Sequence, residues 1–161
     1  MRFPLTVVPA PQVRRCGGCT ACCASMGVRE FGKPMWAVCQ HREGDGCGIY
    51  QDRPASCREF ECLWKQGNLE GDERRRPDNL GLMFTAVNNA TIPTVAAWEV
   101  IPGALERNHF LLSKMAERLL VYCIPHGEKT RRRLMAPKHL EEQIKVVLEK
   151  AYDGQEVEEN W

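Results

Sequence analysis

Eight of the nine cysteines of this chain lie between Cys16 and Cys62, and four of them fall within the segment CGGCTACC. Packing a core does not require thiols at this density, whereas zinc and iron–sulfur clusters select cysteine thiolates as ligands. The CxxC spacing brings pairs of sulfur atoms together on tight turns. Two glycines within the segment permit the positive φ that such turns often need. The segment therefore predicts a metal site.

Disulfide bonds are the alternative use of such a cluster, since small secreted domains are rich in them. The first residues, MRFPLTVVPAPQVRR, contain three prolines that interrupt the apolar stretch of a secretory signal. No segment approaches the roughly 20 apolar residues of a membrane span. We therefore expect a cytoplasmic protein without a membrane partner, in which the thiols stay reduced and can bind metal.

The spacing leaves the identity of the metal open. Cys16, Cys19 and Cys22 repeat the CxxCxxC run that supplies three ligands of a 4Fe–4S cluster in ferredoxin-type proteins. Isolated CxxC pairs, in contrast, are typical of structural zinc sites. The expected cofactor is therefore iron or an iron–sulfur cluster, zinc, or both.

Two adjacent cysteines, Cys22 and Cys23, indicate more than one metal centre. Neighbouring side chains diverge by about 100° on a helix or about 180° on a strand, so both reach one tetrahedral ion only with strain. Eight thiolates would make two closed sets of four ligands. We expect two centres, or one centre in which two metals share a bridge.

The cysteine-rich segment also resembles a known family. CGGCTACC, Trp36, the CQH of residues 39–41 and GCGIYQDRPASCREFEC, which ends at Cys62, are similar to the YkgJ-type family of zinc- or iron-chelating proteins with a CxxCxxCC signature. The resemblance covers about residues 16–65. It implies that the metal-binding set is Cys16, Cys19, Cys22, Cys23, Cys39, Cys47, Cys57 and Cys62. It implies no particular reaction, although flagellin lysine methylases carry a similar cluster.

Side chains beside the cysteines are candidates to tune the metal site. His41 follows Cys39 closely and is a candidate extra ligand or hydrogen-bond donor to a ligand. Arg53 and Arg58 flank Cys57. A guanidinium near a thiolate favours its deprotonated form and donates hydrogen bonds to sulfur. We expect these three side chains to lie around the thiolates.

Other polar features point less specifically to function. Cys123 and His126 have CxxH spacing, but a lone cysteine in an apolar run such as LLVYCI is usually a small buried residue. Basic runs occupy residues 74–76 and 131–133. The net charge is only +1, and no aromatic residues are interleaved with the basic ones, so nucleic acid is not expected as a partner.

The chain divides by composition into an extended arm (1–15), a metal-binding cysteine module (16–65), a polar linker (67–79), an α+β unit (79–152) and an acidic tail (153–161). The module contains few large apolar residues for its length. Structural metals contribute about 10–16 kcal/mol to small modules of this kind. We therefore predict that metal binding and folding of the module are coupled.

Periodicity in the second half predicts a β-hairpin from residues 80–87 and 94–101, a helix over 104–119, a third strand over 119–124 and an amphipathic helix over 140–151. The expected fold class is α+β. A small, irregular, metal-stapled cysteine module would pack on a small antiparallel sheet with two helices, in one compact domain.

Three functional classes fit these features. The first is an iron or iron–sulfur protein that performs redox work or supports a modification reaction. The second is a zinc-stapled structural or interaction module with a protein partner, and the third is a metal-handling protein. All three share one statement, that the chain is a metal-chelating cysteine-cluster protein. The sequence leaves open whether it is an enzyme.

Overall fold

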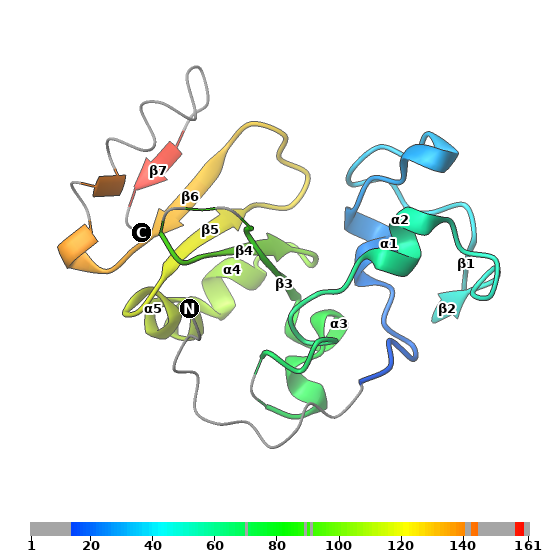
Figure 1. Ribbon diagram of the computed structural model, residues 1–161, viewed down its shortest axis with the longest axis horizontal. Coiled ribbons are helices and arrows are strands. Elements are labelled where there is room, and N and C mark those ends of the chain that lie inside the picture. The colour runs from blue at the N-terminus through cyan, green and yellow to red at the C-terminus, as the bar shows by residue number, and fades with distance from the viewer. Residues whose placement is uncertain are drawn as a thin grey trace.

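The computed structural model describes residues 14–69, 71–88, 90, 92–140 and 143–144, and the backbone of residues 157–159. These residues form two lobes that lie side by side (Figure 1). One lobe is the cysteine module, made of short helices and turns. The other is the α+β unit, built around a five-stranded sheet. The expected α+β class is confirmed.

Regular structure in the cysteine module is short. Its elements are, in chain order, α1 (Ala21–Ser25), η1 (Arg29–Phe31), β1 (Arg42–Glu43), β2 (Gly46–Cys47) and α2 (Ala55–Glu59). β1 and β2 pair antiparallel, with Arg42 opposite Cys47. Pro54 immediately precedes α2, where its missing N–H costs no bond within the helix.

The sheet of the α+β unit has the order β3-β4-β5-β6-β7. Its strands are β3 (Leu82–Ala86), β4 (Thr94–Glu99), β5 (Leu120–Ile124), β6 (Arg132–Met135) and β7 (Val157–Glu159). β3 and β4 form the predicted hairpin, with Leu82 opposite Glu99. β5 is the predicted third strand.

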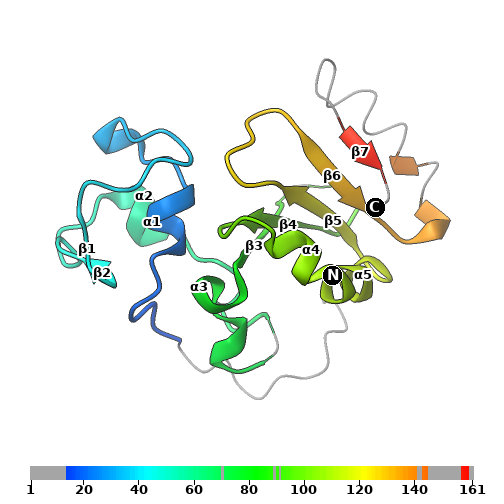
Figure 2. The same ribbon diagram turned by 180° about the vertical axis from the view of Figure 1, so that it is seen from behind.

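The prediction of an antiparallel sheet is wrong, because the sheet is mixed. β4 and β5 are parallel, as are β6 and β7, whereas the other two pairings are antiparallel. The connection from β4 to β5 passes through α4 (Ala104–Arg107) and α5 (His109–Ala116). A helical crossover of this kind joins parallel strands. Figure 2 shows both helices against the sheet.

The predicted helix over 104–119 is divided into α4 and α5 at Asn108. The Asn108 side-chain amide donates hydrogen bonds to the carbonyl oxygens of Leu80 (3.1 Å) and Ala104 (2.8 Å). An Asn side chain that bonds to nearby backbone competes with the regular helical pattern. The crossover therefore consists of two short helices instead of one.

The polar stretch predicted as a linker contains ordered structure. Within residues 67–79 lie η2 (Glu73–Arg75) and most of α3 (Pro77–Leu80). Leu69 and Pro77 are buried. The Arg76 guanidinium donates to both carboxylate oxygens of Asp78, at 2.7 and 2.9 Å. The stretch therefore packs on the α+β unit.

Several expectations fall on parts of the chain that are described only in part. Most of the predicted arm (1–15) lies outside the described residues, as does most of the predicted helix over 140–151. Leu140 ends η3 (Lys138–Leu140), and Ile144 is buried against Leu120 and Leu134. The predicted acidic tail contains β7, which pairs with β6.

The hydrophobic core belongs to the α+β unit and reaches the end of the cysteine module. Its fully buried members include Leu82, Phe84, Leu105, Leu112 and Val121. The last residues of the module join this core through Trp64, which is 3% exposed.

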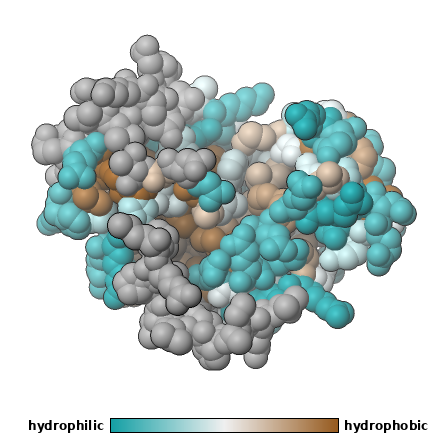
Figure 3. All heavy atoms as spheres, viewed as in Figure 1, coloured by the Kyte–Doolittle hydropathy of each residue, from teal (hydrophilic) through white to brown (hydrophobic). Residues whose placement is uncertain are grey.

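The rest of the module buries little. Over residues 16–61, the buried residues are Thr20, Ala21, Ser25 and Val28. Met35, Val38 and Tyr50 are exposed, with Val38 at 63%. Hydrophilic and neutral residues cover most of the module in the view of Figure 3. The module therefore lacks an apolar core comparable to that of the sheet.

Candidate metal centre

A cavity of about 110 Å³ lies in the cysteine module, and most of the module's thiols line it. Seven cysteines line it: Cys16, Cys19, Cys22, Cys23, Cys39, Cys47 and Cys57. Apolar side chains, including Phe31, Ile49 and Phe60, form much of the remaining wall. All nine cysteines of the chain are free thiols, and the eight clustered ones are partly buried.

Cys16, Cys19, Cys22 and Cys62 form a first set of neighbours, which we call the junction group. The Cys19 N–H donates to the Cys16 carbonyl at 2.8 Å and closes the turn of CGGC. Gly17 enters this turn at φ 52°, as expected for a glycine there. Cys62 lies close enough to Cys16 and Cys19 for their charges to interact, and Cys22 also lies within charge interaction distance of Cys16 and Cys19.

Backbone N–H groups already point at two sulfur atoms of the junction group. Cys19 sulfur accepts hydrogen bonds from the N–H groups of Ala21 and Asp78, and Cys62 sulfur accepts from those of Trp64 and Lys65. Burial raises the pKa of Cys19 to about 11 and also raises that of Cys62. The N–H donors oppose this effect, because they stabilise the thiolate that a metal requires.

Asp78 is a site residue that the sequence did not reveal. Its carboxylate contacts the Cys19 thiol and is held by Arg76. It lay hidden in the stretch interpreted as a linker. Pro77 is the signal that could have revealed this residue, because proline is typical of the first position of a helix. A helix predicted to begin at Pro77 would have Asp78 in its first turn, as α3 does.

Cys23, Cys39, Cys47 and Cys57 form a second set, which we call the distal group. The Cys39 N–H donates to the Cys23 carbonyl at 2.9 Å, and the Arg42 N–H donates to the Cys39 carbonyl at 3.1 Å. Arg42 pairs with Cys47 in the β1–β2 hairpin, and Cys39 and Cys47 both line the cavity. Cys57, on α2, lies within charge interaction distance of Cys23 and Cys39.

The two groups meet at α1, which carries Cys22 and Cys23 side by side. Their thiols share a hydrogen bond that raises the pKa of Cys22 and lowers that of Cys23. Lys33, Arg42 and Arg53 lower the Cys23 pKa further, since each cation favours the thiolate. The hydrogen bond and the cations therefore make Cys23 the more acidic thiol of the pair.

The predicted tuning residues lie at different places. Arg53 lines the cavity, with its guanidinium 3.7 Å from the centre of the Tyr50 ring and its Nε donating to the Tyr50 carbonyl at 2.9 Å. His41 also lines the cavity, but its Nε2 is 3.1 Å from the Gln40 amide nitrogen. Arg58 is exposed on α2 and is not part of the cavity wall.

The CxxH pair lies apart from the cavity. Cys123 is fully buried in the sheet core, and burial raises its pKa to about 12. His126 is exposed on the loop after β5, and its backbone N–H donates to the Glu99 carboxylate at 2.9 Å. Neither residue lines the cavity formed by the other cysteines.

As the side chains stand, no three His, Cys, Asp or Glu residues in the described part of the chain are arranged to hold a metal ion. The thiols surround a cavity rather than converge on one point. Their donor type, their N–H partners and the nearby cations nevertheless suit a thiolate-bound metal. The sulfur atoms of each group would have to move closer to bind one.

No family model, curated protein or solved structure matches this chain. The resemblance to the YkgJ-type family therefore depends on the motif residues alone. Among the described residues, no helix is long and apolar enough to cross a membrane.

Proposed function

We propose that this chain is a metal-chelating cysteine-cluster protein that binds iron, as a 4Fe–4S cluster or as single ions, or zinc. Eight thiolates in two centres would be the ligands. The observation that carries the proposal is the gathering of seven thiols around one cavity, with Cys62 beside them. These residues come from five separate parts of the module, and burial of apolar surface does not explain their meeting.

The charges around the cavity support the same proposal. A divalent ion with four thiolates carries a formal charge of −2, and such a centre is stabilised by cations and by N–H donors to sulfur. Lys33, Arg42 and Arg53 surround Cys23, and backbone N–H groups face Cys19 and Cys62. When bound, iron would supply electron transfer, and zinc would supply a cross-link.

The proposal includes membership of the YkgJ-type family. It also includes a cytoplasmic location, because metal binding needs reduced thiols. A purely structural zinc role is the second candidate. The specific observation that favours it is the small apolar core of residues 16–61. A module with so little burial needs another source of stability.

Anaerobic purification followed by elemental analysis and absorption spectroscopy tests the proposal. Zinc would give two equivalents and no colour, whereas an iron–sulfur centre would give iron, sulfide and visible absorption that is lost on oxidation. A Cys123→Ser variant serves as the control and should retain the full metal content, since Cys123 lies in the sheet core. Protein that folds but retains no zinc or iron would disprove the proposal.

A further inference from the structure

We infer that the two groups are separate metal centres with different roles. The junction group would hold a structural metal that fastens the cysteine module to the α+β unit. The distal group would hold an accessible metal that exchanges with chelators. This inference rests on the proposed metal binding and assigns each thiol to a centre, which the spacing of the cysteines does not do.

The junction group is attached to the α+β unit at two points. Directly after Cys62, the Leu63 N–H donates to the Phe84 carbonyl of β3 at 2.8 Å, and Trp64 enters the sheet core. Cys19 contacts Asp78 of α3 through both the backbone and the side chain of that residue. A metal held by Cys19 and Cys62 would therefore cross-link the turn of CGGC to segments that pack on the sheet.

Arg14 also links the start of the CGGC turn to the residues that follow Cys62. Its guanidinium donates to the carbonyl oxygens of Trp64 (3.2 Å), Leu69 (3.0 Å) and Gly71 (3.0 Å). It also lies 5.2 Å from the centre of the Trp64 ring. These contacts place the start of the CGGC turn next to the segment that follows Cys62.

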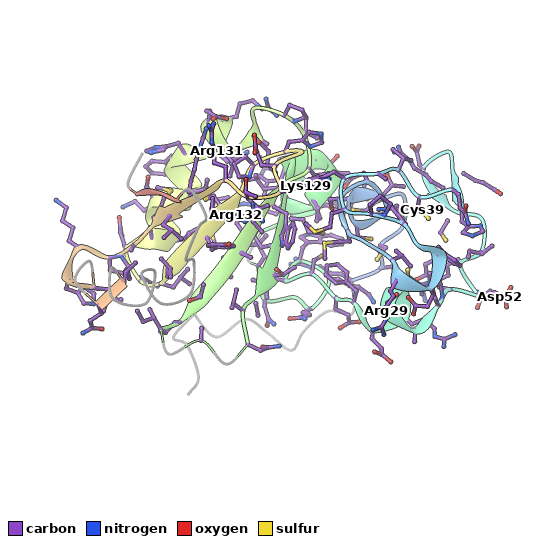
Figure 4. The ribbon with its side chains drawn as sticks, turned by 90° about the horizontal axis from the view of Figure 1, so that it is seen from above. Arg29, Cys39, Asp52, Lys129, Arg131 and Arg132 are labelled. Atoms are coloured by element: carbon purple, nitrogen blue, oxygen red, sulfur yellow. The ribbon has the colours of Figure 1, made fainter. Side chains whose placement is uncertain are left out.

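Apart from α1, which carries Cys23, the distal group lies on elements that contain no buried residue. α2 contains no buried residue, and both residues of β1 are exposed. Figures 1 and 2 place the β1–β2 hairpin at the end of the module away from the sheet, with α2 beside α1. In Figure 4, Cys39 lies in the lobe with Arg29 and Asp52, away from Lys129, Arg131 and Arg132 of the other lobe. A metal here would be within reach of solutes.

The surroundings of the distal group also favour exchange with anionic chelators. Lys33, Arg42 and Arg53 lie near Cys23, and the Lys33 ammonium also lies near Cys39 and Cys57. These cations attract anions in solution. In the exchange, the ion passes to the chelator and the released thiolates that take up protons receive them from water. Cations also lie near the junction group, Lys33 near Cys22, Lys65 near Cys16 and Arg76 near Cys19. The difference in exchange rate is therefore expected from the greater exposure of α2 and β1.

Chelation kinetics of the zinc-loaded wild-type protein test the inference. With EDTA in excess, we expect one equivalent of zinc to leave quickly and the second at least tenfold more slowly. Hydrogen exchange at the Leu63 amide reports the contact between the cysteine module and the α+β unit, because this amide donates to the Phe84 carbonyl of β3. Its protection should persist through the fast phase and fall only in the slow phase. A single phase that releases both equivalents, or loss of Leu63 protection in the fast phase, would overturn the inference.

A matched pair of variants assigns the phases to the two groups. Cys57→Ser should remove the fast-leaving equivalent and retain Leu63 protection, whereas Cys62→Ser should remove the slow one and lose that protection. Cys39→Ser is a second distal variant and should behave like Cys57→Ser. If Cys62→Ser does not fold, the wild-type kinetics and the two distal variants still decide. Distal variants that lose the slow equivalent contradict the assignment, whereas a wild-type protein that binds no metal contradicts the proposed function instead.

Discussion

At the residue scale, Arg14 makes several contacts with the segment that follows the junction group. It donates to three carbonyl groups of residues 64–71 and lies over the Trp64 ring. These carbonyl oxygens would lose charged donors in an Arg14→Ala variant, which costs about 1–3 kcal/mol of unfolding free energy. Urea unfolding measures this loss. Arg15→Ala is the control, since Arg15 is exposed, and an equal loss in both variants would contradict this role.

Single residues also show what the sequence could and could not reveal about the site. The density of cysteines was enough to predict that these thiols gather at one place in the fold. The division into junction and distal groups was not predictable, because it depends on which segments meet. Asp78 reaches Cys19 only through the fold of α3, and Arg58 faces solvent although it follows Cys57 directly. Proximity to Cys57 in the sequence made Arg53 and Arg58 equal candidates for a place beside the thiolates. Only the fold shows that Arg53 lines the cavity and Arg58 does not.

At the element scale, α2 depends on a carboxylate from another element. The Glu30 side chain, in η1, accepts hydrogen bonds from the Ser56 N–H (3.1 Å) and the Ser56 hydroxyl (2.7 Å). Ser56 lies in the first turn of α2, next to Cys57, where a negative charge favours the helix start. Glu30 therefore holds the helix that carries a distal thiol.

This contact predicts a dependence on pH. The hydrogen bonds from Ser56 lower the pKa of Glu30 below its ordinary value of 4.5. The folded state therefore binds the proton more weakly than the unfolded state, so the stabilisation is complete above that ordinary value and is lost as pH falls through the lower folded value. Wild type should be more stable than Glu30→Gln at pH 7, and the difference should shrink below pH ~4.5.

Thermal unfolding of both proteins at matched metal content measures this difference. Acid also displaces metal from thiolates, but this effect is common to the two proteins and cancels in the comparison. Glu43→Gln is the control, because Glu43 is an exposed carboxylate of β1 in the same module. A difference between wild type and Glu30→Gln that does not change with pH would contradict the role of the Glu30 charge.

Elements of the α+β unit were predictable where they depend on local pattern. The β3–β4 hairpin and β5 follow from apolar runs and turn residues in the sequence. β6 was not identified, because Arg131–Arg133 was interpreted as a basic run. Arg132 is in fact only 8% exposed, and its guanidinium donates to the Tyr122 hydroxyl (3.1 Å) and the Lys129 carbonyl (2.8 Å). Buried arginines of this kind resemble surface residues in the sequence.

At the scale of the whole molecule, Trp36 joins the two lobes away from the cysteines. Its Nε1 donates to the Glu128 carbonyl at 3.1 Å, and its ring centre lies 6.3 Å from that of Trp98 and 5.1 Å from that of His126. Trp36 has φ 65°, in the left-handed region, which costs a non-glycine residue about 1–3 kcal/mol. The contacts with the α+β unit offset this strain.

Replacing Trp36 should therefore weaken the association of the lobes. We expect Trp36→Ala to lower the unfolding free energy by about 1–3 kcal/mol and to increase hydrogen exchange in the loop containing Glu128. Val38→Ala is the control, since Val38 is 63% exposed in the same segment. Unchanged exchange at Glu128 in the Trp36 variant would show that this contact does not join the lobes.

The unequal burial of the two lobes leads to a final prediction, on removal of all metal. The α+β unit has its own apolar core, whereas residues 16–61 bury Thr20, Ala21, Ser25 and Val28. Without metal, the burial of these few residues cannot offset the conformational entropy of ordering the module. Exhaustive chelation should therefore make the module sensitive to trypsin at Arg29, Arg42 and Arg58, while the sheet amides stay protected. Addition of zinc should restore resistance, and a fully apo protein that keeps the module resistant would show that folding and metal binding are independent.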